Sequence, residues 1–293
     1  MERIKGVFTA LITPFDKDKK IDEESLRKLV DLQIEAGISG LVPCGTTGES
    51  PTLSHEEHCR VIEIVIDQAK GRVPILAGTG SNNTSEAIYL TQKAREMGAD
   101  FSLQIAPYYN KPTQDGFFEH FSRIASEVDI PIIIYNIAGR TGKNIETETI
   151  KKLSAIDNIA GVKEASGDIA QMMDVYEQTP DNFTVLSGDD NLTLPLISVG
   201  GDGVVSVVSN ICPREVVKMV RSALDGDYKK ARETHYELLP LFKAAFLETN
   251  PIPIKYMTSL ILKCENNLRL PMTALQEENR EKCRSIMKNI GVI

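Results

Sequence analysis

The sequence predicts an α/β fold, a (β/α)8 TIM barrel with a small C-terminal helical extension. A chain of 293 residues has the length of one such barrel with a modest addition. Eight short apolar runs follow one another, and each amphipathic segment between them is long enough for one crossover helix. Strands that are apolar along their whole length are typical of parallel sheets covered by helices. Eight successive units favour a closed barrel over a doubly wound sheet, although two open sheets would give a similar pattern.

The predicted elements alternate along the chain. Among the helices, Ser54 and Glu57 form the pattern of a capping box, and Gly37 and Gly98 are predicted helix ends. From about Pro213 onward the pattern is helical only. We therefore expect a barrel domain over residues 1–225 and a helical region over residues 226–293. The predicted strands occupy residues 7–12, 40–43, 75–77, 101–105, 132–135, 160–163, 184–186 and 203–207.

Composition excludes several classes of function. A net charge of -8 argues against a nucleic-acid partner, which requires a basic surface. The first ten residues have no basic segment followed by a long apolar run, so we expect neither secretion nor a membrane anchor. The five cysteines are an odd number without any CxxC pair, which is typical of free thiols in a reducing compartment. We expect a cytoplasmic protein.

In a barrel, chemistry belongs to the carboxyl ends of the strands, and Lys163 is the strongest candidate there. Burial lowers the pKa of a lysine, and the neutral amine attacks a ketone to form an imine. The Tyr135 phenol, one strand away, could shuttle protons, and the hydroxyl groups of Thr46 and Tyr109 could extend a relay to water. The alternative is a lysine that reaches solvent or pairs with Glu164.

Other chemistries find no support in the sequence. The turn at residues 45–50 has no lysine of a Walker motif, and residues 78–80 lack the third glycine of a dinucleotide fingerprint. No serine has the glycine neighbours of a nucleophile elbow. The four histidines include neither HxH nor HExxH, so we expect no metal and no cofactor.

Five spaced motifs, taken together, resemble one family. They are GTTGE at 45–49, Tyr135-Asn136 with Arg140-Thr141-Gly142, GVKEASG at 161–167, SGDD at 187–190 and NPIPIK at 250–255. The chain is similar, over nearly its whole length, to the pyruvate-dependent Schiff-base lyase and aldolase family typified by dihydrodipicolinate synthase.

The resemblance implies a mechanism and its residues. Pyruvate would form a Schiff base with Lys163, Tyr135 would be the proton shuttle, and Thr46 and Tyr109 would complete the relay. Tyr109 would reach in from a neighbouring subunit, which implies a homotetramer made of two tight dimers. The implied contacts to pyruvate are made by Thr47, Gly188 and Val205.

The resemblance also implies the reaction. Pyruvate would condense with L-aspartate 4-semialdehyde to give 4-hydroxy-tetrahydrodipicolinate, in diaminopimelate and lysine biosynthesis. Arg140 would hold the carboxylate of the semialdehyde. Members of the family often have proline where this chain has Ala138, so the loop that carries Arg140 is less constrained here.

Two alternatives differ in function. Sister aldolases, such as N-acetylneuraminate lyase or those for 2-keto-3-deoxy sugar acids, share the lysine and the tyrosine, and Arg140 argues for the semialdehyde. A barrel that only binds a keto acid and regulates another protein is a third hypothesis, which the complete set of catalytic positions disfavours.

A second polar cluster is left unused by this chemistry. Its residues offer a carboxylate for an ammonium group and several donors for a carboxylate, the polarity of a free amino acid. Without the resemblance, surface histidines and a helix-capping glutamate would explain them. By resemblance, these positions form an allosteric site at which L-lysine inhibits the enzyme. The cluster comprises Ser50, His55, His58, Asn82, Glu86 and Tyr108.

Overall fold

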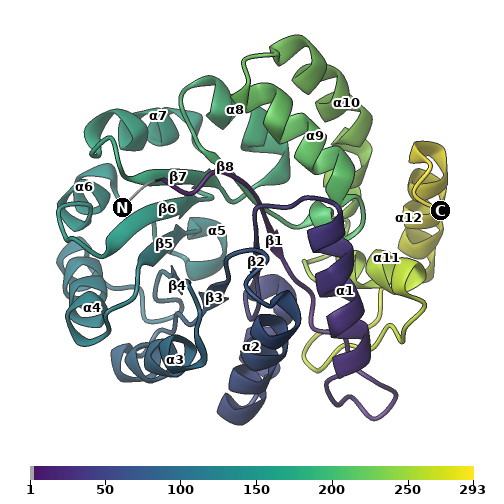
Figure 1. The fold of residues 1–293 in the computed structure, drawn as a ribbon, viewed down its shortest axis with the longest axis horizontal. Coiled ribbons are helices and arrows are strands. Elements are labelled where there is room, and N and C mark those ends of the chain that lie inside the picture. Colours follow the sequence, from purple (N-terminus) through teal and green to yellow (C-terminus); the bar gives the residue numbers. More distant parts are fainter. Residues whose placement is uncertain (1–2) are drawn as a thin grey trace.

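Eight parallel strands form a barrel at the centre of residues 3–293, the part of the chain that this computed structural model describes (Figure 1). They pair in the order β2-β1-β8-β7-β6-β5-β4-β3. The seam between β2 and β3 is narrow, with a parallel bridge from Leu41 to Ile75 and a 2.9 Å hydrogen bond from the Gly78 amide to the Pro43 carbonyl. The predicted closed barrel is confirmed. The strands are β1 (Gly6–Ala10), β2 (Gly40–Val42), β3 (Leu76–Gly78), β4 (Phe101–Ile105), β5 (Ile132–Asn136), β6 (Ile159–Glu164), β7 (Thr184–Ser187) and β8 (Gly203–Ser206).

All eight predicted strands coincide with observed ones, and the differences lie at their ends. The first was predicted to extend to Ile12, but β1 ends at Ala10. Beyond this point the Ile12 amide donates to the side-chain oxygen of Asn210 and so leaves the ladder. Apolar sequence continues past the ladder because the loop that follows is also buried, and burial rather than pairing sets the pattern.

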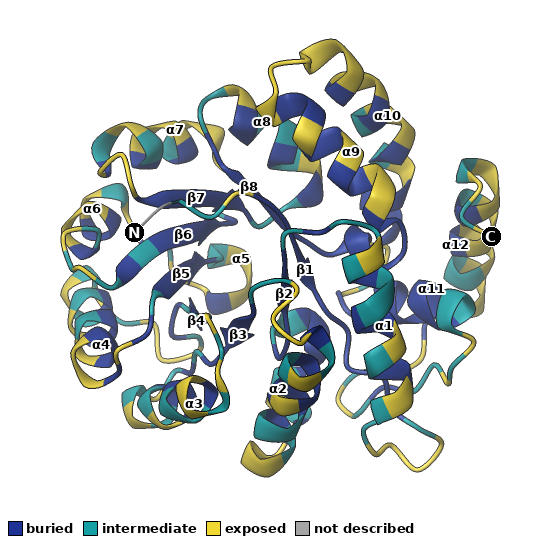
Figure 2. Ribbon diagram, viewed as in Figure 1, coloured by how far each residue is buried: buried dark blue, intermediate teal, exposed yellow. Residues whose placement is uncertain are grey.

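Helices surround the barrel, and the helices between successive strands turn their buried sides toward the strands (Figure 2). The predicted capping box is present at the start of α2, where the Glu57 amide donates to the Ser54 hydroxyl and the Ser54 amide donates to the Glu57 carboxylate. Gly98 ends α3 with a φ of 96°, as predicted. The helices are α1 (Glu23–Glu35), α2 (His55–Ala69), α3 (Thr84–Met97), α4 (Gln114–Glu127), α5 (Ala138–Thr141), α6 (Thr147–Leu153), α7 (Ile169–Gln178), α8 (Thr193–Ser198), α9 (Pro213–Leu224), α10 (Tyr228–Ala244), α11 (Ile252–Leu262) and α12 (Glu277–Ile290).

The C-terminal helices are packed against the barrel to different degrees. Helix α10 lies along α9, and α12 packs on α10 and α11 at the outer edge of the molecule (Figure 1). Helix α11 is buried over most of its length and lies against the loops at the carboxyl ends of the strands through Ile254 and Lys255. No helix within residues 3–293 has the length and apolarity needed to span a membrane.

Candidate active site

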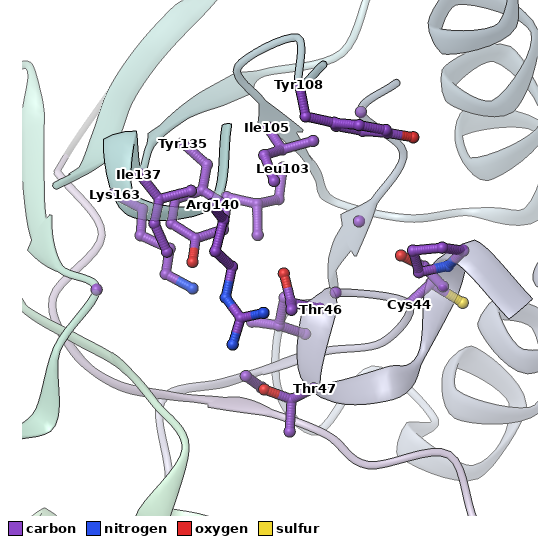
Figure 3. A pocket seen from close by; sticks show the side chains of 18 of the residues that line it. Cys44, Thr46, Thr47, Leu103, Ile105, Tyr108, Tyr135, Ile137, Arg140 and Lys163 are labelled. Carbon is purple, nitrogen blue, oxygen red and sulfur yellow. The ribbon is translucent and has the colours of Figure 1, made fainter. Parts of the chain in front are cut away.

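The carboxyl ends of the strands surround a cavity of about 390 Å³. Its walls come from the loop after β2, the ends of β5 and β6, helix α5 and the loop after β7. In Figure 3 the side chains from these elements face one another across the cavity. Six of the residues predicted to act in catalysis or substrate binding line it: Thr46, Thr47, Tyr135, Arg140, Lys163 and Gly188.

Lys163 points into the barrel from the end of β6. Only 5% of this residue is exposed, and its amine lies 3.9 Å from the centre of the Tyr135 ring. Burial lowers the pKa of Lys163 to about 8, although the nearby charges of Asp189 and Asp190 act in the opposite direction. At this pKa a useful fraction of the amine is neutral near physiological pH.

Glu164 does not neutralise this amine. Successive side chains of a strand face opposite sides, so Glu164 points away from the cavity. It accepts hydrogen bonds from the Ser166 amide at 2.7 Å and the Asn136 side chain at 3.1 Å. Neither alternative proposed for Lys163, escape to solvent or pairing with Glu164, is observed within the described residues.

Tyr135 lies next to Lys163 because the two residues are register partners on adjacent strands. Its phenol is buried, and burial raises its pKa, while a hydrogen bond with Thr46 partly offsets this effect. Thr46 belongs to a short 3₁₀ helix, η1 (Thr46–Gly48), at the start of the loop that follows β2. The structure therefore joins three of the four relay residues, and the phenol stays protonated at neutral pH.

Tyr109, the fourth relay residue, lies outside the cavity of this chain. It is 90% exposed in the loop between β4 and α4, with a φ of 72°. Within residues 3–293, no hydrogen bond joins Tyr109 to Thr46 or Tyr135, so the relay ends at Thr46 in the single chain.

Arg140 and Thr47 each form a hydrogen bond with Asn250. The Arg140 guanidinium crosses the cavity mouth from α5 and donates to the Asn250 carbonyl oxygen at 3.0 Å. The Asn250 side-chain amide donates to the Thr47 hydroxyl, also at 3.0 Å. Figure 3 shows Arg140 directed toward the loop that carries Thr46 and Thr47.

The loop after β7 passes close to Lys163 because it contains Gly188. A Cβ atom at this position would lie 2.6 Å from the Ala165 methyl carbon and 3.1 Å from Cε of Lys163. Only glycine allows this approach without displacing the lysine. Val205, the other predicted contact, is fully buried in the barrel interior beside Tyr135 and does not line the cavity.

The proposed effector cluster opens into the same cavity through Ser50, His55, His58, Glu86 and Tyr108. The His55 imidazole lies 2.6 Å from the Glu86 carboxylate, whose pKa is lowered by hydrogen bonds first from Ser81 and then from His55. His58 is buried, which lowers its pKa, and its ring contacts the Gly78 carbonyl at 2.7 Å.

Asn82, the sixth member of the cluster, lies behind the cavity wall, where it donates to the Tyr108 carbonyl at 3.0 Å. It therefore supports the Tyr108 loop in this chain. Among residues 3–293, no group of three or more histidine, cysteine or acidic side chains could hold a metal ion.

Asp189, Asn250 and Phe246 are among the cavity residues that were not predicted as site residues. Asp189 and Asn250 belong to the motifs at 187–190 and 250–255, which were quoted without a role for these side chains. Phe246 is half exposed at the rim of the cavity. The 250–255 motif marks Asn250 without giving its side chain a role, and nothing in the local pattern marks Phe246, because both residues follow α10 and reach the site through tertiary packing.

Comparison with known proteins identifies full-length relatives. The sequence model of the dihydrodipicolinate synthetase family matches residues 3–290. A protein of Endomicrobium trichonymphae named 4-hydroxy-tetrahydrodipicolinate synthase is 54% identical over 98% of this chain and 99% of its own length.

Two solved structures are also similar over nearly their whole lengths. The chloride-inhibited dihydrodipicolinate synthase of Acinetobacter baumannii, complexed with pyruvate, has a TM-score of 0.97 and 41% identity and covers 99% of this chain and 100% of its own. The enzyme of Cyanidioschyzon merolae with lysine bound has a TM-score of 0.97 and 38% identity over 100% of both chains.

Proposed function

The chain belongs to the dihydrodipicolinate synthetase family, and from this membership we propose that it condenses pyruvate with L-aspartate 4-semialdehyde to give 4-hydroxy-tetrahydrodipicolinate. It is a lyase of this family, as the motifs predicted. One observation carries the proposal: a buried amine with a lowered pKa, at Lys163, stands against the buried phenol of Tyr135 in the wall of a cavity.

The first half-reaction uses Lys163 and Tyr135. The neutral amine attacks the keto carbon of pyruvate, and the Tyr135 phenol donates the proton with which the carbonyl oxygen leaves as water. The resulting iminium withdraws electrons, so the methyl group loses a proton to the Tyr135 phenolate and becomes a nucleophilic enamine. This transfer restores the phenol, and Thr46, bonded to Tyr135, connects it to the rest of the relay. The hydroxyl of Thr47 is placed to bind the pyruvate carboxylate.

In the second half-reaction the enamine attacks the aldehyde carbon of the semialdehyde, and the alkoxide that forms takes the proton of the Tyr135 phenol. Arg140 holds the carboxylate of this second substrate, since its guanidinium lies across the cavity mouth. The amino group of the adduct then attacks the iminium carbon, which closes the ring and releases the amine of Lys163.

Assembly and regulation are part of the proposal. Tyr109, exposed in the single chain, completes the relay of a neighbouring subunit in a homotetramer of two tight dimers. L-Lysine inhibits the enzyme at the cluster around Glu86, as the lysine-bound relative suggests. The pathway is diaminopimelate and lysine biosynthesis in the cytoplasm, a reducing compartment that suits five free cysteines.

Borohydride trapping tests the proposed function. Reduction in the presence of pyruvate is expected to add a reduced pyruvyl mass to the peptide that contains Lys163, and EDTA is expected to leave turnover unchanged. Enzyme from the same preparation that has not been reduced is offered pyruvate with aspartate semialdehyde or with sugar aldehydes in parallel, and the semialdehyde is expected to be preferred. An adduct on another lysine would refute the mechanism, and preference for a sugar aldehyde would assign the chain to a sister aldolase.

A further inference from the structure

Among residues 3–293, Asn250 forms hydrogen bonds with both proposed substrate-binding residues, Thr47 and Arg140. It lies in the loop between α10 and α11, 4% exposed, and lines the cavity. Its side-chain amide donates to the Thr47 hydroxyl, and its backbone carbonyl accepts from Arg140. We propose that Asn250 is a positioning residue that sets the polarity of Thr47 for the pyruvate carboxylate and, separately, fixes Arg140 for the second substrate. This inference rests on the proposed function.

The hydroxyl proton of Thr47 is free to bind an acceptor in the cavity. A hydroxyl group has one proton to donate and two lone pairs that accept. Because Thr47 accepts from Asn250, its own proton points elsewhere. No acceptor for this proton is found among the described residues, and the side chain borders the cavity. A carboxylate, which accepts hydrogen bonds and donates none, is the complementary ligand.

Asn250 is held rigidly relative to the loop after β2. Asn250 is followed directly by α11, whose residue Lys255 forms a buried ion pair with Glu49 in the loop that carries Thr47. The loop after β2 and the start of α11 are therefore joined at two points. The donor of Asn250 is held in place before any substrate arrives, so no ordering is required on binding.

The two contacts of Asn250 are chemically separable. The bond to Thr47 uses the side chain, whereas the bond to Arg140 uses the backbone carbonyl, which every substitution keeps. Substitution at Asn250 should therefore weaken pyruvate binding while leaving semialdehyde binding nearly intact. Substitution at Arg140 should do the reverse.

The test measures half-saturation by pyruvate in borohydride trapping, which needs no second substrate. Asn250→Ala is expected to raise this value about 3- to 10-fold, the worth of one neutral hydrogen bond. Asn250→Asp is nearly isosteric but acts as an acceptor, so it turns the Thr47 proton away from pyruvate and adds a like charge. The pyruvate half-saturation of Asn250→Asp is expected to rise on the order of 100-fold. In steady-state turnover, the KM for semialdehyde is expected to change less than about twofold in Asn250→Ala.

A double-mutant cycle separates positioning from packing. In a Thr47→Val background, Asn250→Ala is expected to cause no further loss of pyruvate affinity, because the hydroxyl that it orients is gone. The matched control is Asn158→Asp, at a half-buried asparagine that donates to the Ala125 and Val128 carbonyls at the opposite end of the barrel. Its pyruvate half-saturation is expected to match that of the wild type.

Two outcomes would overturn the inference: Asn250→Asp no worse than Asn250→Ala, or losses from Asn250→Ala and Thr47→Val that simply multiply. Far-UV circular dichroism and thermal unfolding check that each variant is folded. If Asn250→Asp does not fold, the double-mutant cycle of Asn250→Ala with Thr47→Val still tests the inference. If the wild type itself fails to trap pyruvate on Lys163, the proposed function fails. If the wild type traps pyruvate and the variants show either of the two overturning outcomes, only the proposed role of Asn250 fails.

Discussion

The reactivity proposed for Lys163 depends on a balance at one residue. Burial disfavours the ammonium form, while Asp189 and Asp190 favour it, and the result is a pKa of about 8. With a pKa of 8, about a tenth of the amine is neutral at pH 7, far more than for an exposed lysine. The charges of Asp189 and Asp190 keep the pKa of Lys163 from falling further, so the neutral amine remains a good proton acceptor.

The first prediction follows from this balance. The rate of pyruvate trapping on Lys163 at low pyruvate should rise with pH up to about 8 and then level off, because only the neutral amine attacks. Quenched-flow trapping across a pH series measures the midpoint. Asp189→Asn removes a charge that stabilises the ammonium, so it should move the midpoint to lower pH. A midpoint near 10 would mean that Lys163 is not desolvated.

Arg140 gives the second prediction. Arg140→Ala should reduce kcat/KM for aspartate semialdehyde by about 10- to 150-fold, since a charged hydrogen bond to a carboxylate contributes roughly 1.5 to 3 kcal/mol. Pyruvate trapping on Lys163 should change much less. Lys143→Ala is the matched control, because Lys143 is an exposed cation in the same loop. Full turnover of Arg140→Ala with semialdehyde would favour a sugar-acid aldolase.

At the scale of elements, the loop after β2 is held by α11. Glu49 has a left-handed backbone conformation, with a φ of 55°, which is unfavourable for a residue other than glycine. Its carboxylate pairs with Lys255 and accepts from the Arg269 amide at 3.1 Å. Both members of the ion pair are 1% exposed, so each depends on the other for compensation.

The third prediction concerns this pair. Lys255→Met alone should lower the free energy of unfolding by about 3 to 5 kcal/mol, because it leaves the Glu49 carboxylate buried and unpaired. The double variant Glu49→Gln with Lys255→Met should recover much of the loss. Denaturant unfolding of the three proteins measures both effects. Lys282→Met, which breaks an exposed pair with Glu278, should change the value by less than about 1 kcal/mol. Equal losses for the buried and the exposed pair would contradict this account.

At the scale of the whole molecule, the proposed catalytic and effector residues share one cavity. Lys163 lines it, and so do His55 and Glu86, from α2 and α3, and Tyr108. Tyr108 directly precedes Tyr109, the residue proposed to act in a neighbouring subunit. A ligand at Glu86 could therefore alter proton transfer without occupying the pyruvate site.

The fourth prediction is partial inhibition by millimolar or lower L-lysine. Glu86→Ala should weaken it, because the carboxylate that receives an ammonium group is lost, and His58→Ala should weaken it as well. Pyruvate trapping on Lys163 should persist at saturating L-lysine. Glu96→Ala, at an exposed carboxylate of the same helix, is the control. Activity indifferent to L-lysine, with no binding heat in calorimetry, would leave the cluster without an effector.

The fifth prediction concerns Tyr109. If it acts across an interface, Lys163→Ala and Tyr109→Ala should each be nearly inactive, and subunit exchange between them should restore activity. A hybrid dimer contains one complete site, so equal mixing should recover about a quarter of wild-type turnover. Analytical ultracentrifugation should give four chains per particle. Absence of recovery in particles that have exchanged subunits would place Tyr109 outside the relay.

The barrel fold and the pairing of Lys163 with Tyr135 could be predicted from the amino-acid sequence. Eight apolar runs separated by amphipathic segments fit only a few topologies, because parallel strands require crossover helices. The end of each run also identifies the face on which reactive groups meet, so Lys163 and Tyr135 could be paired before any coordinates. Strand ends were less certain, since the burial of β1 continues beyond its last residue, Ala10.

The contacts that fix the loop after β2 could be seen only in the folded structure. Thr47 and Asn250 are 203 positions apart and Glu49 and Lys255 are 206 apart, so no local pattern relates them. Their contacts arise because α11 packs on the loops at the carboxyl ends of the strands. The exposure of Tyr109 was equally invisible to the sequence, which marks an aromatic residue but not its surroundings. Periodicity reports which face of an element is buried, whereas the partner of a buried polar group depends on packing between elements distant in the chain.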